Sequence, residues 1–189
     1  MALTLLQMRT RVANRVGTSD DNDVLLNKGQ EKLAQMSKRR ARATLAFVSG
    51  EATIPATCLI LKKLAFSGYP CNLAPESEFV FPKYESNTTP EEYQISNGTI
   101  VLETKYTGSG TIIYVPKPAT MSLDTDTPEF SGCEEALIAF AIHKRYKDNE
   151  DIAQAKYWSD EWLSEAEDWL DLDKKQNRQS HRVKAGSWS

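Results

Sequence analysis

The chain has few of the residues from which disulfide frameworks and metal centres are built. Its 189 residues include three cysteines, Cys58, Cys71 and Cys133, and two histidines, His143 and His181. The cysteines are far apart without C-x-x-C spacing, and no second imidazole or thiol stands at metal-ligand spacing from either histidine. We therefore predict reduced thiols, no disulfide framework and no bound metal.

Long apolar runs are scarce as well. No stretch approaches the roughly 20 apolar residues that span a bilayer. The segment Met1–Thr4 has no charged region ahead of an apolar one, which is not typical of a secretory signal. We expect a protein made in a cytoplasm, with no membrane contact.

Motifs for catalysis and for cofactor binding are also missing. The sequence has no G-x-S-x-G, no G-x-x-x-x-G-K-[ST] and no G-x-G-x-x-G before a helix. Gly108-Ser109-Gly110 lies between two expected strands, so we interpret it as a turn. Asp124 and Asp126 alternate, but the glycine and glutamate of a calcium-binding loop do not follow. We predict no catalytic residue and no cofactor, and a metal-dependent hydrolase using these two aspartates is the least favoured hypothesis.

Charge is unevenly distributed along the chain. The formal net charge is −3, which excludes binding of polyanions by bulk attraction alone. Residues 148–173 hold ten carboxylates and one base, whereas residues 174–189 hold five bases and no acid. This asymmetry predicts an acidic segment followed by a basic tail that becomes ordered on a partner.

Apolar residues recur at three- and four-residue spacing in four segments, which predicts four helices. The first ends at Gly17, and the second ends in a basic cluster after Met36. The third begins at Cys133 and breaks near Asp148. The fourth is expected from about residue 150 to 172. We interpret its apolar stripe as core: Ile152, Ala155, Trp158, Trp162, Ala166 and Trp169.

Between the two pairs of helices, residues 44–116 have the pattern of a small antiparallel β unit. Asn97-Gly98 predicts a hairpin because these residues tolerate the positive φ angles of a type I′ turn. Ser49-Gly50 predicts the turn of another hairpin, which joins residues 44–48 to 51–54. Five prolines between residues 55 and 90 predict a loop-rich stretch. The expected strands are 44–48, 51–54, 58–66, 92–95, 99–105 and 111–115.

The order of elements predicts an α+β protein. Its simplest architecture is a helical bundle formed from the N- and C-terminal segments, with a small antiparallel β domain inserted between them. The expected parts are an N-terminal helical hairpin (1–43), the β insertion (44–118), the C-terminal helices (119–173) and a basic flexible tail (174–189).

Several segments, taken in order, carry a family resemblance. They are Leu3–Gly17, the Asn-x-x-Gln of Leu25–Glu31, a β insertion closing at Tyr114–Pro118, and Leu123–Pro128 followed by the last two helices. In this order they resemble the adaptor, or head-to-tail connector, proteins that lie below the portal of tailed bacteriophages. The likeness covers residues 1–172. The family often has an aromatic residue just after the second helix, where this chain has Arg40-Ala41-Arg42.

This resemblance implies a structural subunit of the virion neck and no catalytic activity. The subunit would form a ring, expected to be a dodecamer, that docks below the portal protein and links the capsid to a tail or stopper protein. Genomic DNA would pass through the ring during ejection without specific binding. The basic tail would dock on the portal through Lys174, Lys175, Arg178, His181, Arg182, Lys184 and Trp188.

The acidic face of the last helix has two interpretations. In a monomer it would be a solvated surface. In a ring it would line the channel, where carboxylates repel the phosphates of passing DNA. The residues expected on this face are Asp160, Glu161, Glu165, Asp168 and Asp171.

A second function is also compatible with the sequence. The chain would be a DNA-associated accessory protein whose basic tail contacts phosphates, with an affinity that falls steeply with salt. The strongly acidic helix before the tail argues against this alternative.

Overall fold

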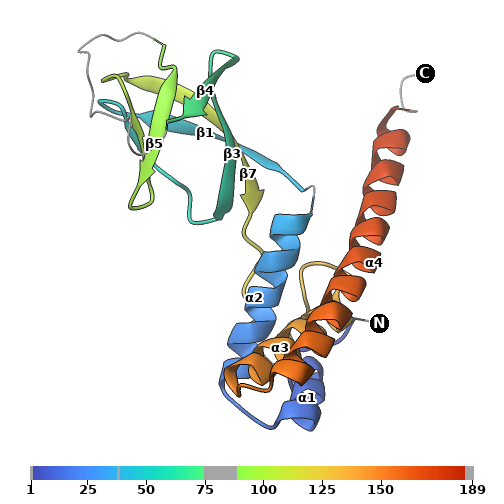
Figure 1. The fold of residues 1–189 in the computed structure, drawn as a ribbon. Coiled ribbons are helices and arrows are strands. Elements are labelled where there is room, and N and C mark those ends of the chain that lie inside the picture. Colours follow the sequence, from blue (N-terminus) through green and yellow to red (C-terminus); the bar gives the residue numbers. More distant parts are fainter. Residues whose placement is uncertain (1, 38, 75–88, 186–189) are drawn as a thin grey trace. The chain divides into compact units, whose positions relative to one another are not determined.

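The computed structural model describes the backbone of residues 2–37, 39–74 and 89–185, and the side chains of these ranges as far as Lys175. Over these residues the protein is α+β, as expected, with four helices and seven strands (Figure 1). Contacts divide it into two compact units. The helical unit consists of Met1–Lys38 and Pro118–Ser189, and the β unit consists of Arg39–Lys117.

The helices of the helical unit begin and end close to the predicted positions, except at the C-terminus. A capping box of Thr4 and Gln7 begins the first helix, and Gly17, at φ +86°, ends it. The second helix begins at Asp21, so that the carboxylates of Asp21 and Asp23 lie in its first turn and interact favourably with the helix dipole. The basic end predicted for this helix is wrong, because the helix stops at Met36 and its last turn holds no basic residue. The four are α1 (Leu5–Val16), α2 (Asp21–Met36), α3 (Glu134–Asp148) and α4 (Ile152–Ala185).

Helix α3 lies at the centre of the helical unit. Every residue from Ala136 to Ile142 is buried, because α1, α2 and α4 all pack against it. Gly29 allows α2 to approach closely, since a Cβ at this position would lie 3.1 Å from Leu137 and 3.3 Å from Phe140. A run that is apolar on all sides therefore corresponds to a helix covered on all sides.

The aromatic stripe of α4 packs on α3 and on the linker before it, as predicted for core residues. Trp162 makes an edge-to-face contact with Phe140 at 5.3 Å. Trp169 is buried against Phe130 and donates its indole N–H to the carbonyl of Ser131. The stripe does not follow the prediction throughout, because Ile152 is 81% exposed and Trp158 and Trp162 are only partly buried.

The end expected for the last helix, at residue 172, is wrong. Helix α4 continues to Ala185 and so includes most of the segment predicted as a flexible tail. Its C-terminal part is polar and basic with good helix formers such as lysine, arginine and glutamine. None of the helices in the described ranges is both long and apolar enough to cross a membrane.

The β unit is a single sheet of seven strands that curves back on itself. The strand order is β1-β7-β3-β4-β5-β6-β2, and the two edge strands meet again at a Val48–Glu51 bridge. Its core is formed by Phe47, Leu64, Phe66 and Ile112. The strands are β1 (Ala41–Phe47), β2 (Glu51–Thr53), β3 (Cys58–Phe66), β4 (Tyr69–Leu73), β5 (Glu92–Ser96), β6 (Thr99–Leu102) and β7 (Gly108–Pro116).

The sheet is mixed rather than purely antiparallel. Strands β4 and β5 pair in parallel, with Asn72 opposite Glu92, whereas the other ladders are antiparallel. The β5–β6 hairpin is confirmed, with φ of +48° at Asn97 and +76° at Gly98. Strand β4 was missed because Pro70 argued against a strand, although the Ser67-Gly68 turn before it was a usable signal.

The predicted hairpin around Ser49-Gly50 is wrong beyond its turn. Both residues have positive φ, but β1 then pairs with β7 and β2 pairs with β6. Gly50, in the turn, forms two hydrogen bonds with the segment 102–106. Its N–H donates to the carbonyl of Tyr106, and its carbonyl accepts from the N–H of Leu102. Beyond the Val48–Glu51 pair, the two strands therefore continue along different partners.

Gly108-Ser109-Gly110 is also not the turn that was expected. These residues begin β7 and pair with the end of β1. A Cβ on Gly110 would lie 2.8 Å from the rings of both Phe47 and Phe66. The glycine is required by close packing of aromatic rings and not by a turn.

Candidate docking surfaces

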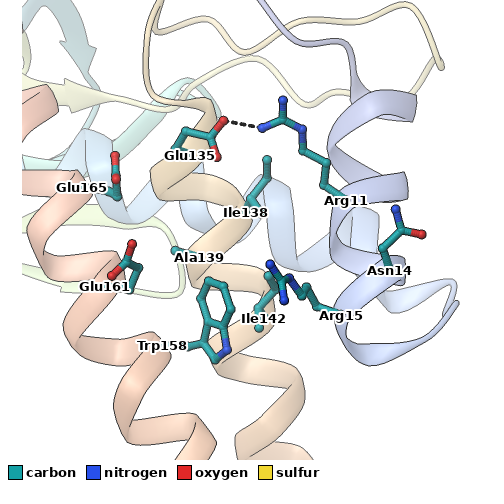
Figure 2. Close-up of a pocket in the computed structure, with 10 residues that line it drawn as sticks. All are labelled: Arg11, Asn14, Arg15, Glu135, Ile138, Ala139, Ile142, Trp158, Glu161 and Glu165. Carbon is teal, nitrogen blue, oxygen red and sulfur yellow. Dashed lines mark hydrogen bonds and ion pairs between the residues drawn. The ribbon is translucent and has the colours of Figure 1, made fainter.

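The helical unit contains a groove of about 480 Å³ between α1 and α4, with α3 as its floor (Figure 2). The floor is apolar, and the two walls carry charges of opposite sign. The residues that line the groove are Arg11, Asn14 and Arg15 from α1, Glu135, Ile138, Ala139 and Ile142 from α3, and Trp158, Glu161 and Glu165 from α4.

Helix periodicity places the two arginines of α1 on the same wall, one turn apart. Arg11 forms an ion pair with Glu135 of α3 at the edge of the groove (Figure 2). Arg15 lies one turn further along, where its backbone carbonyl accepts a hydrogen bond of 3.4 Å from the hydroxyl of Tyr146. The α1 wall therefore presents a cationic edge.

The opposite wall is acidic. Glu161 and Glu165 lie one turn apart on α4, both half-buried, and neither forms an ion pair with the described residues. Partial burial raises the pKa of Glu165, and the negative charges of Glu161, Glu135 and Asp168 raise it further. A cation from a partner placed in this groove would relieve that repulsion.

The structure divides the five carboxylates expected on one acidic face into two groups. Glu161 and Glu165 line the groove, whereas Asp160, Asp168 and Asp171 are exposed. The helix spacing alone did not show this division, because it depends on where α1 packs. Asp171 accepts a hydrogen bond of 2.7 Å from Lys174, which lowers the pKa of the aspartate.

Of the tail residues expected to dock on the portal, two are described. Lys174 and Lys175 are exposed on α4. Arg178, His181, Arg182 and Lys184 fall within the backbone of α4, but their side chains lie outside the described residues, as does all of Trp188.

Asp124 and Asp126, the weak candidates for a cation site, have structural partners. Asp124 binds Arg9, which also donates two hydrogen bonds of 2.7 Å to Asp23. The Asp126 carboxylate accepts backbone N–H groups from Ser122 and Leu123, and these bonds lower its pKa. The described ranges contain no group of three or more histidine, cysteine, aspartate or glutamate side chains arranged to hold a metal.

Two amide side chains of α2, whose role the sequence did not reveal, position the linker before α3. Asn27 donates to the carbonyl of Met121 at 3.0 Å and accepts from its N–H at 2.8 Å. Gln30 does the same for two linker residues, donating to the carbonyl of Ala119 and accepting from the N–H of Glu129. Their three-residue spacing puts both on one helix face. The sequence signal was the Asn-x-x-Gln motif, which carried the family resemblance but did not show what the two amides bind.

An apolar floor between oppositely charged walls suits contact with another protein, since charge complementarity orients a partner and apolar area holds it. These features are typical of a surface that contacts another protein. The chain belongs to the SU10 adaptor protein family, a family of bacteriophage head-tail adaptors, whose family model matches residues 3–184. No curated protein matches the chain.

Membership confirms the resemblance seen in the sequence. It assigns a structural, non-enzymatic role as a component of the phage particle, in contact with other head or tail components. The match extends across both units and along most of α4, so it concerns the whole architecture and not a single motif.

Proposed function

We propose that the chain is the repeating subunit of a head-to-tail connector ring in the neck of the phage particle. The ring, a dodecamer, docks below the portal protein and receives a tail or stopper protein on its other side. The single observation that carries this proposal is the family match over residues 3–184. In this arrangement the helical unit is a bundle formed from both ends of the chain, and the β unit is its insertion.

Within this proposal the charged residues of α4 have separate roles. Asp160, Asp168 and Asp171 are exposed and line the channel, where they repel passing DNA. Glu161 and Glu165 face the groove and contact a neighbouring protein instead. The basic end of α4 and the residues after it dock on the portal.

The test is light scattering after gel filtration, with and without the portal protein of the same phage. We expect a ring-sized complex in the presence of portal, and its loss when residues 174–189 are deleted. A matched control replaces these residues by a scrambled segment of the same composition, which keeps the charge and loses the docking surface. Failure of the intact chain to bind portal would overturn the proposal, and a shift with DNA alone would favour the accessory-protein alternative.

A further inference from the structure

The strands of the β unit separate charge by sign. Three adjacent strands, β1, β7 and β3, carry three basic side chains and no acidic one. Three other adjacent strands, β5, β6 and β2, carry Glu51 and Glu92 and no basic side chain. We name the outward side chains of the first set, Arg42, Lys62 and Lys63, the basic arc, and Glu51 and Glu92 the acidic arc.

Strand register places the basic arc in one row across the sheet. Arg42 pairs with Ile113, and Ile113 pairs with Lys63 on the next strand. A register shift between Leu61 and Lys63 adds Lys62 beside this row. All three basic side chains are exposed, whereas residues next to them in sequence, such as Leu64, fill the core.

The acidic arc is built in the same way on the other strands. Glu51 pairs with Val101, and Val101 pairs with Gln94 of β5. Glu92 begins β5, and two further carboxylates, Glu91 and Glu103, flank the strands there. Lys105 also follows β6, but it already has an interaction within the chain.

The curvature of the sheet separates the two arcs. Strand β7 is the middle strand of the basic arc, and β6 is the middle strand of the acidic arc. Because the edge strands meet at the Val48–Glu51 bridge, the sheet is nearly closed, and outward side chains on its two halves face different directions. None of the arc residues forms an ion pair within the described part of the chain.

We propose that the basic arc of one copy binds the acidic arc of the next copy, so that the β units form a head-to-tail contact around the ring. This inference rests on the proposed ring function. A ring closed by rotation needs two different, complementary surfaces on each subunit, and the two arcs meet that requirement. A nucleic acid would match only the basic arc and would be repelled by the acidic one, so a second copy is the better occupant.

Two charge-reversal variants test the contact. The first, Arg42→Glu/Lys63→Glu, makes both arcs acidic, and the second, Glu51→Lys/Glu92→Lys, makes both arcs basic. Each alone is expected to form about tenfold less ring on portal than the native chain, because like charges then meet at every contact. Mixed in equal amounts, the two are expected to restore assembly, since an alternating ring again matches opposite charges.

The control, Lys32→Glu/Lys156→Glu, makes the same change in net charge as the first variant, on exposed residues of the helical unit. Circular dichroism and a thermal melt on every variant separate misfolding from lost contact. If the native chain assembles on portal and both arc variants assemble equally well alone, this inference is overturned while the ring function stands. Loss of DNA binding by the first variant, with assembly unchanged, would also overturn it. If the native chain does not assemble, the proposed function fails first.

Discussion

Asn27 and Met121 are joined by two hydrogen bonds, in which the side-chain amide of one pairs with the backbone N–H and carbonyl of the other. The side-chain amide of Asn27 thus makes the two hydrogen bonds that the backbone of a paired strand would make. Gln30, one turn on, holds the same linker at Ala119 and Glu129. These amides thus hold the linker that leads into α3, the central helix of the unit.

Replacing Asn27 by alanine is therefore expected to lower the free energy of unfolding by about 1–3 kcal/mol, since it leaves two partly buried backbone groups of Met121 without partners. Chemical denaturation at neutral pH measures the change. The matched control is Gln35→Ala on the same helix, where the side chain accepts a hydrogen bond from Lys32 at the surface. Equal losses for the two variants would contradict this role for Asn27.

Replacing Gly110 by alanine is expected to destabilise the β unit by about 1–3 kcal/mol, because the added Cβ overpacks a core with little free space. The new atom would lie 2.8 Å from the rings of Phe47 and Phe66, which contact each other at 5.1 Å. Thermal unfolding followed by near-ultraviolet circular dichroism reports on those rings. Ser109→Ala, at the exposed neighbouring position, is expected to change stability little.

The Asp126 carboxylate stabilises the folded chain only while it is ionised. Hydrogen bonds from Leu123 and Ser122 lower its pKa, so the folded state holds the proton less tightly than the unfolded state. Its contribution is present above the unfolded pKa of about 4 and is lost as pH falls through the lowered folded value. Asp126→Asn should be less stable than the native chain at pH 7, with a difference that shrinks at pH 3. A pH-independent difference would show that charge is not the cause.

Glu165 should behave in the opposite sense. Its pKa is raised by partial burial and by neighbouring carboxylates, so the folded state holds the proton more tightly than the unfolded state. Stability therefore falls as pH rises from the unfolded value of about 4.3 through the raised folded value. Glu165→Gln is expected to be more stable than the native chain at pH 7 and equal to it near pH 4. Asp160→Asn, on the exposed side of α4, serves as the control in the same denaturation series.

Elements of the fold could be predicted from the sequence where the residues that determine them are close together in the chain. The first helix was found to the residue at its C-terminus because Gly17 ends it without help from distant groups. The Asn97-Gly98 hairpin was found for the same reason. The partners of β1 and β2 were not predicted, because the two strands pair with β7 and β6, and Gly50 between them bonds to residues more than fifty positions away.

The candidate docking surfaces could likewise be predicted only in part. The excess of carboxylates in residues 148–173 was visible in the sequence. That Glu161 and Glu165 line a groove opposite Arg11 and Arg15 was not visible, since α1 and α4 lie at opposite ends of the chain. The separation of charge between the two halves of the sheet was likewise hidden, because β7 lies beside β1 and β3 only after the sheet has formed.

By itself the sequence determined the α+β class, the four helices and the adaptor family, because periodicity, caps and motif order are properties of neighbouring residues. The tertiary structure alone decided the mixed strand order, the hydrogen bonds of Asn27 and Gln30 to the linker before α3, and the position of two oppositely charged walls across one groove. These depend on contacts between residues far apart in the chain. The free energy of such contacts comes from burial and from hydrogen-bond partners that do not exist until the chain has folded.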